Sequence, residues 1–218
     1  MNFPVSTVYG KRVPKKTFAD KLKLNSPIRK SIQDDIQTIR WTYTLKEATL
    51  NLPAGKEVHE IEVLEMKLKH NSINEKVLQQ FDRQIPYHLL FVLQYEEKVQ
   101  AWMSYKEAAS ANQAFRVEKY YHTKWMRPEK LNFQIEGTNF DEVYESLARQ
   151  IAGEDLQSIA TGESLKKSIE RNEEIIALEK ETESLQQKLK KEKQFNRKME
   201  INQKIKQCKN KIEDMLNG

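Results

Sequence analysis

The sequence is poor in the residues that build disulfide frameworks, nucleotide-binding loops and membrane helices. Its single cysteine, Cys208, cannot form an internal disulfide, and none of its six glycines stands in the spacing of a phosphate-binding loop. The longest clear apolar run, residues 88–93, is far shorter than the roughly 20 residues of a membrane helix. The N-terminus also lacks the pattern of a secretory signal. We therefore expect a cytoplasmic protein with no membrane span and no nucleotide cofactor.

Patterns for metal or covalent catalysis are scarce as well. The four histidines are scattered along the chain, and no His or Cys spacing typical of a zinc site occurs. The nucleophile-elbow and catalytic-triad signatures are absent too. The sequence therefore predicts neither a resident metal nor a cofactor.

What the chain does contain is charge and aromatic side chains. Charged residues make up 32% and hydrophobic residues 38% of the 218, with a mean hydropathy of -0.79. This composition is too polar for two fully packed domains, whereas eight Phe, eight Tyr and three Trp argue against general disorder. We expect one folded domain with a polar extension.

Positive charge is concentrated at the two ends of the chain. Residues 1–30 hold eight Lys or Arg and one acid, and residues 188–211 hold ten Lys or Arg and two acids. The rest of the chain is net acidic. Basic ends of this kind attract phosphate backbones or an acidic partner, although solvated helix faces have the same composition.

Hydrophobic periodicity predicts alternating helices and strands up to about residue 153. Helices are expected at 15–24, 26–35, 74–83 and 140–152, and strands at 38–45, 48–52, 59–69, 88–93, 99–105 and 115–122. The apolar run 88–93 is typical of a central strand, and 96–98 of the turn of a hairpin.

The fold class that follows is α+β, with one mixed-sheet globular domain and flanking helices, followed by a long C-terminal helical arm. We divide the chain into a basic N-terminal lead-in (1–25), the globular domain (26–153) and a basic coiled-coil arm (164–218). One heptad seam of the arm contains Leu178, Leu185 and Leu189, and a second, shifted seam contains Ile201, Ile205, Cys208, Ile212 and Met215. Either one long helix changes seam between residues 192 and 198, or a helical hairpin turns there.

One pattern favours catalysis. The order helix, three strands, helix, strand across residues 27–93 is that of PD-(D/E)xK nucleases, and Glu65 and Lys67 share one face of the third strand. Such an enzyme needs Mg²⁺ and a second carboxylate, but the preceding strand offers only Asn51. Alternating charges on a strand also serve as cross-strand pairs. A divergent Mg²⁺-dependent nuclease is therefore the alternative hypothesis.

Two other groups of residues favour binding. Residues 119–127 interleave bases with aromatic rings, so Tyr121 and Trp125 are candidates for stacking on nucleic-acid bases, or else part of the core. The strongest electrostatic signal lies in the arm. The candidate contacts to nucleic acid or a partner are Lys188, Lys190, Lys191, Lys193, Arg197, Lys198, Lys204 and Lys206, with Lys15 and Lys16 at the other end; Lys209 and Lys211 extend the arm's cluster.

Short segments spread along nearly the whole chain carry a family resemblance. They are Arg12-Val-Pro-Lys-Lys16, Ile39-Arg-Trp41, Thr49-Leu-Asn-Leu52, Glu60-Ile61, Ile85-Pro-Tyr87, Tyr105-Lys106, Tyr121 with Trp125, and Glu192-Lys-Gln-Phe-Asn-Arg-Lys198 with Asn202. Together they resemble the bacterial family catalogued as domain of unknown function 4391. The resemblance supplies no catalytic residue. It implies accessory proteins encoded beside helicases and DNA methyltransferases in restriction and phage-defence systems.

The sequence thus favours a non-catalytic accessory subunit over an enzyme. Its expected partners are a helicase or methyltransferase-type protein and DNA or RNA, with no membrane. The seams of the arm also allow a homo-oligomer that pairs through the arm.

Overall fold

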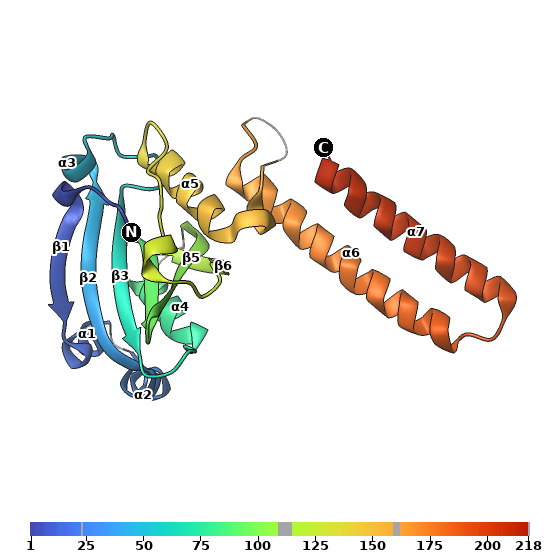
Figure 1. Cartoon of the computed structure of the whole chain (residues 1–218), viewed down its shortest axis with the longest axis horizontal. Coiled ribbons are helices and arrows are strands. Elements are labelled where there is room, and N and C mark those ends of the chain that lie inside the picture. The colour runs from blue at the N-terminus through green and yellow to red at the C-terminus, as the bar shows by residue number, and fades with distance from the viewer. Residues whose placement is uncertain (23, 109–114, 159–161, 218) are drawn as a thin grey trace. The chain divides into compact units, whose positions relative to one another are not determined.

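The computed structural model of the chain describes residues 1–22, 24–108, 115–158 and 162–217 (Figure 1). The chain divides into two compact units, Met1–Ala152 and Gly153–Gly218. We call the first unit the body and the second the arm.

The body is built on one six-stranded mixed sheet. Its strands are β1 (Val8–Val13), β2 (Ile36–Lys46), β3 (Glu60–Leu68), β4 (His88–Tyr95), β5 (Lys98–Ala108) and β6 (Phe115–His122). They lie side by side in chain order, and each neighbouring pair is antiparallel except β3 and β4. A parallel pair needs a crossover connection, which the helix between β3 and β4 provides.

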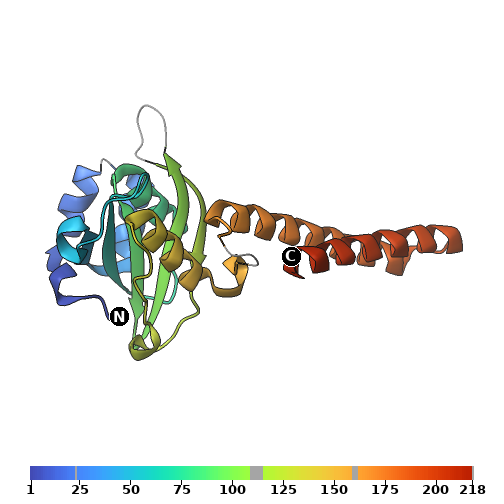
Figure 2. The same cartoon turned by 90° about the horizontal axis from the view of Figure 1, so that it is seen from above.

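Helices cover both faces of this sheet (Figure 2). They are α1 (Lys15–Lys21), α2 (Ser26–Asp35), the single turn α3 (Glu47–Leu50), α4 (Glu75–Gln84) and α5 (Phe140–Ala152), with short 3-10 turns η1 (Val5–Thr7) and η2 (Pro128–Lys130). Side chains of α1, α2 and α4 form one apolar cluster with β2, β3 and β4. The contacts of α5 are to β3, β5 and β6, on the opposite face (Figure 2).

Local sequence signals explain several of these elements. The side chains of Asn25 and Asn74 accept hydrogen bonds at the starts of α2 and α4, where the first N–H groups lack helical partners. All six residues of the apolar run 88–93 are buried, as expected for a central strand. The α+β fold class and the hairpin of β4 and β5 are therefore confirmed.

The strands differ from the expected ones at two places. Residues 8–13, assigned to the lead-in, form the edge strand β1 and pair with β2. Residues 48–52, expected as a strand, are occupied by α3 and by Asn51 in the left-handed region at φ 53°. The Thr49 hydroxyl accepts a hydrogen bond from the Lys46 N–H at 3.0 Å, which favours the turn over an extended chain. Only two strands therefore stand between α2 and α4, instead of the three of the nuclease core.

The arm is a helical hairpin, which decides between the two arrangements that the sequence left open. A 3-10 turn η3 (Gly153–Leu156) precedes α6 (Leu165–Lys191), which is followed by α7 (Phe195–Asn217) running back along it (Figure 1). The two seams pack against each other in one apolar cluster. Its members are Leu178, Leu185, Leu189, Ile201, Ile205 and Cys208. The shift between the seams thus marks the turn.

No helix in the described part of the chain is both long and apolar enough to cross a lipid bilayer. The longest two, α6 and α7, carry charge along their whole length.

Candidate functional site

The distal half of the arm, residues 188–211, is the most basic segment of the molecule. It comprises the last turn of α6, the connecting turn and about the first three-quarters of α7. Every cation in it is exposed: Lys188, Lys190, Lys191, Lys193, Arg197, Lys198, Lys204, Lys206, Lys209 and Lys211. The hairpin therefore brings the candidate contacts of the C-terminal end into one segment.

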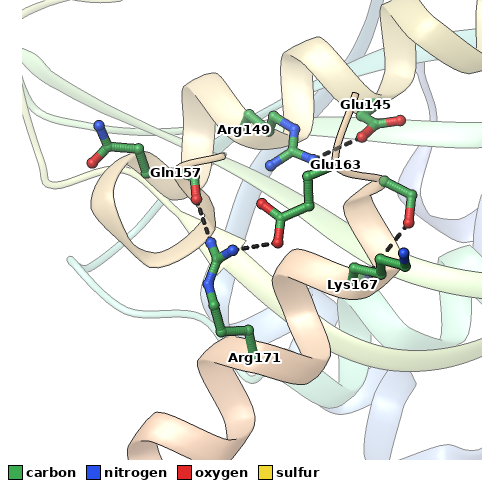
Figure 3. Close-up of polar contacts among 7 residues, drawn as sticks. Glu145, Arg149, Gln157, Glu163, Lys167 and Arg171 are labelled. Atoms are coloured by element: carbon green, nitrogen blue, oxygen red, sulfur yellow. Dashed lines mark hydrogen bonds and ion pairs between the residues drawn. The ribbon is translucent and has the colours of Figure 1, made fainter. Parts of the chain in front are cut away.

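Within the described residues, none of these ten cations forms an ion pair with a carboxylate. The proximal end of the arm behaves differently. The Arg171 guanidinium pairs with Glu163 and donates to the Gln157 carbonyl oxygen, as Figure 3 shows. In the described part of the arm, a cation near the start is thus held in an ion pair, whereas the cations of residues 188–211 are not.

The turn between the helices contains a single carboxylate, which accepts hydrogen bonds from backbone N–H groups. Glu192 accepts hydrogen bonds from the N–H groups of Lys193 and Gln194, both at 2.8 Å. These bonds hold the pKa of Glu192 below its ordinary value, with a further contribution from the positive charge of Arg197 and Lys198. The carboxylate therefore fixes the turn and leaves the neighbouring cations to solvent.

Two large apolar side chains are exposed beside these cations. Phe195, the first residue of α7, is 74% exposed and Met199 is 57% exposed. Their four-residue spacing places them on one face of α7. Neither residue was predicted from the sequence as functional, although the segment 192–198, which carries part of the family resemblance, contains Phe195. An exposed ring among cations is an arrangement that binds single-stranded nucleic acid.

The N-terminal basic residues have a different role in the structure. Lys15 Nζ donates to the Ile36 carbonyl oxygen at 2.6 Å, and burial, followed by the charge of Lys69, lowers its pKa. Arg29 pairs with Asp20. Lys16 is exposed. This end of the chain is folded into the body, and part of its charge is already used there.

The two candidate stacking residues contribute to the core of the body. Tyr121 lies on β6 and is 4% exposed, so its ring offers no open face to a base. Trp125 is half-buried and packs against the large apolar cluster. Their role in this structure is packing.

The nuclease alternative depends on Glu65 and Lys67 of β3. The alternation of buried residues along β3 places both on the face opposite the large apolar cluster, as expected. The neighbour of Glu65 on β2 is Arg40 and its neighbour on β4 is Val92. In the described part of the chain, no three His, Cys, Asp or Glu side chains gather as a metal site would require. The register favours a cross-strand charge pair.

A buried ion pair that was not predicted from the sequence joins Asp82 of α4 to Lys106 of β5. Lys106 Nζ bonds to Asp82 Oδ1 at 2.8 Å and to the Tyr87 carbonyl oxygen at 2.8 Å, and the Tyr120 hydroxyl donates to the same carboxylate. Both charged side chains are 0% exposed. Burial lowers the pKa of Lys106, whereas the charge of Asp82 opposes that shift. Because solvent cannot reach the pair, we interpret it as structural.

A second buried carboxylate, Glu62, was also missed. The Trp41 indole N–H and the Thr44 hydroxyl both donate to it. In a regular strand, residues 41 and 44 would face opposite sides, but the register of β2 against β3 shifts between Trp41 and Tyr43. Strict alternation along the predicted strand 38–45 would separate these two donors, so the sequence pattern alone does not bring them to one carboxylate.

Comparison with known proteins agrees with the resemblance carried by the short segments. No curated protein and no solved structure matches the chain significantly. Residues 1–212, which include both the body and nearly all of the arm, match one protein family. The chain therefore belongs to the family described as Domain of unknown function (DUF4391).

Proposed function

We propose that this chain is a non-catalytic, cytoplasmic accessory subunit that binds nucleic acid through the distal half of its arm. The observation that carries the proposal is the set of ten exposed cations that form no ion pair within the described residues. When cations of this kind bind phosphates, counterions condensed on the nucleic acid are released, and this release provides most of the affinity of sequence-independent binding.

Phe195 and Met199 favour single strands over duplex. Unpaired bases present their faces to an aromatic side chain, and stacking contributes about 1–3 kcal/mol per base. In a duplex those faces are covered by neighbouring base pairs. The ring beside Lys193, Arg197 and Lys198 therefore supports a site for a single strand or an unpaired end.

The proposed protein partner is a helicase or a DNA methyltransferase in a bacterial restriction or phage-defence system. This part rests on the family to which the chain belongs and on what the resemblance implies. Co-purification of the full-length chain with the product of a neighbouring gene, before and after substitution of the arm's cations, tests it.

The nucleic-acid part is tested on the full chain by fluorescence anisotropy with a short single strand and its duplex. Lys190, Lys191, Lys193 and Arg197 are changed together to Ala. We expect at least about tenfold weaker binding, because each lost phosphate contact removes counterion release. The matched control removes four exposed body lysines, Lys21, Lys30, Lys56 and Lys98, and should bind like the wild type. Equal affinity of the two variants would refute the proposal.

Phe195→Ala separates stacking from charge. We expect weaker binding to the single strand by about 1–3 kcal/mol and little change with duplex. Leu216→Ala is the control, because Leu216 is 58% exposed near the other end of α7. An equal loss with both nucleic acids would contradict the stacking role.

A further inference from the structure

A cavity of about 300 Å³ opens on the body over β1, β2 and β3. The proposed function makes no use of it. The groups that face it include the carboxyl groups of Glu60 and Glu62, the rings of Tyr9, Trp41 and Tyr87, and Lys46 at the rim. Two acids and three aromatic rings around one opening form an unusual set for a surface without a ligand.

Glu62 is the most deeply buried acid that lines this cavity. It is 2% exposed, and both of its donors, the Trp41 indole and the Thr44 hydroxyl, bond to the same oxygen, Oε2. A further hydrogen bond joins Glu62 to the neighbouring side chain of Glu60. A negative charge on a nearly buried carboxylate is costly unless a cation balances it.

The neighbouring acid, Glu60, increases that cost. Burial, together with the hydrogen bond to Glu60, raises the pKa of Glu62 to about 8, so the two side chains retain a proton that separate carboxylates would release. Lys46 faces Glu60 across the β2–β3 pair but is exposed and forms no ion pair with either acid in the described structure. The acids therefore lack a cationic partner.

The aromatic walls indicate which cation fits. The rings of Tyr9 and Trp41 are 5.8 Å apart between centroids and inclined by 59°. Inclined rings do not form the parallel slot that a flat base needs, whereas ring faces attract ammonium groups. A magnesium ion keeps several waters and prefers oxygen ligands, which these rings do not offer. Carboxylates and ring faces together suit an organic amine.

We propose that this cavity binds a protonated primary amine, with the ammonium group between Glu60 and Glu62 and the alkyl chain along Trp41 and Tyr87. The ligand class includes free polyamines and the side chain of a lysine from another protein. Its ammonium supplies hydrogen bonds to the carboxylate oxygens and its positive charge balances the paired acids.

Calorimetric titration of the full chain with spermidine, n-butylamine and Nα-acetyl-lysine amide tests the proposal. We expect saturable binding at one site, weakened roughly tenfold or more by Glu62→Gln, because the variant keeps the shape but cannot ionise when the ammonium group binds. Glu65→Gln, on the opposite face of β3, should leave the affinity unchanged. Tighter binding of spermidine than of the lysine amide assigns the site to free polyamines, and the reverse order assigns it to lysine side chains.

Two further measurements keep the test decisive. Tyr87 is 36% exposed at the rim, so Tyr87→Ala should fold and weaken amine binding even where Glu62→Gln does not fold.

Binding at neutral pH should release a proton, so the observed heat should depend on the ionisation enthalpy of the buffer. The titratable groups facing Glu62 are Glu60, Tyr9, Tyr87 and Lys46. The absence of saturable binding, unchanged affinity in the cavity variants, or displacement of the amine by Mg²⁺ would overturn the proposal.

Discussion

Charged side chains differ between the body and the arm in their burial and in their ion pairing. In the body, the Asp82–Lys106 pair is fully buried and bonded to Tyr120 and to a backbone carbonyl. In the distal arm, ten cations are exposed and form no ion pair in the described structure. Charge inside the body holds the fold together, because an unpaired buried charge is destabilising. Charge on the arm contributes little to folding and is available for a ligand.

The two basic ends of the chain differ in the same sense, although their compositions are similar. Lys15 bonds to the backbone of β2, and Arg29 pairs with Asp20. The distal arm has no comparable internal partners among the described residues. Net charge alone therefore does not identify a binding surface, and the internal partners of each cation have to be known.

The largest effect is expected from breaking the buried pair. Asp82→Ala leaves Lys106 buried without its counter-charge, and we expect a loss of about 3–5 kcal/mol in the free energy of unfolding. Urea denaturation followed by circular dichroism measures it. The control is Asp20→Ala, which breaks the exposed pair with Arg29 and should cost less than about 1 kcal/mol. Similar costs for the two variants would contradict the distinction between buried and exposed charge.

The next effect concerns the seam of the arm. Ile205 is 8% exposed, and Ile205→Asp places a charge in the apolar cluster, so we expect the hairpin to lose about 2–4 kcal/mol. Faster proteolysis within α6 and α7 would show the opening. Light scattering of the wild type is the companion measurement, because a stable dimer would mean that the arm also pairs between copies.

A smaller effect depends on pH. Glu62 has a pKa of about 8 when folded, above its ordinary value of 4.5, so it contributes fully to stability below pH 4.5 and loses that contribution as the pH rises through 8. Glu62→Gln stays neutral throughout. We expect the variant to gain on the order of 1–2 kcal/mol relative to the wild type between pH 5 and pH 9. A difference independent of pH would contradict a protonated Glu62.

The contribution of His88 to folding stability has the opposite pH dependence to that of Glu62. Burial, then the charge of Lys106, lowers its pKa from 6.5 to about 3, so its contribution is present above pH 6.5 and is lost as the pH falls toward 3. Stability of the wild type should therefore decline on both the acidic and the alkaline side. A thermal melting series across pH measures both limbs.

The smallest effect is expected at Glu65 and Lys67. Both lie on β3 with an exposed or half-buried side chain, and Glu65→Ala or Lys67→Ala should change stability by less than about 1 kcal/mol. Neither should change binding of nucleic acid. If the wild type cleaves DNA with Mg²⁺ and either variant does not, the nuclease alternative replaces the accessory role.

Hydrophobic periodicity over short segments was sufficient to predict much of the fold. The spans 115–122 and 140–152 coincide with β6 and α5, because alternation and four-residue spacing are properties of neighbouring residues. Strand β1 was not predicted from the sequence because it is short and exposed, with a glycine at its centre and little apolar alternation. The segment 48–52 was misassigned because the side-chain bonds of Thr49 outweigh its β propensity.

The candidate site was only half visible in the sequence. The basic segment 188–211 is a local excess of lysine and could be found by counting. The absence of partners for these cations is a property of the folded chain. The Glu62 cavity was invisible for a different reason, since it depends on a bulge in β2 that brings Trp41 and Thr44 to one carboxylate.

The most direct measurement of the central claim is the salt dependence of single-strand binding by the full chain. If the distal arm contacts phosphates, the logarithm of the affinity falls linearly with that of the salt concentration, with a slope of about 0.7 for each contact. The variant lacking Lys190, Lys191, Lys193 and Arg197 should then show a slope smaller by about 2–3 units. A wild-type affinity insensitive to salt, or an identical slope in the variant, would contradict the account.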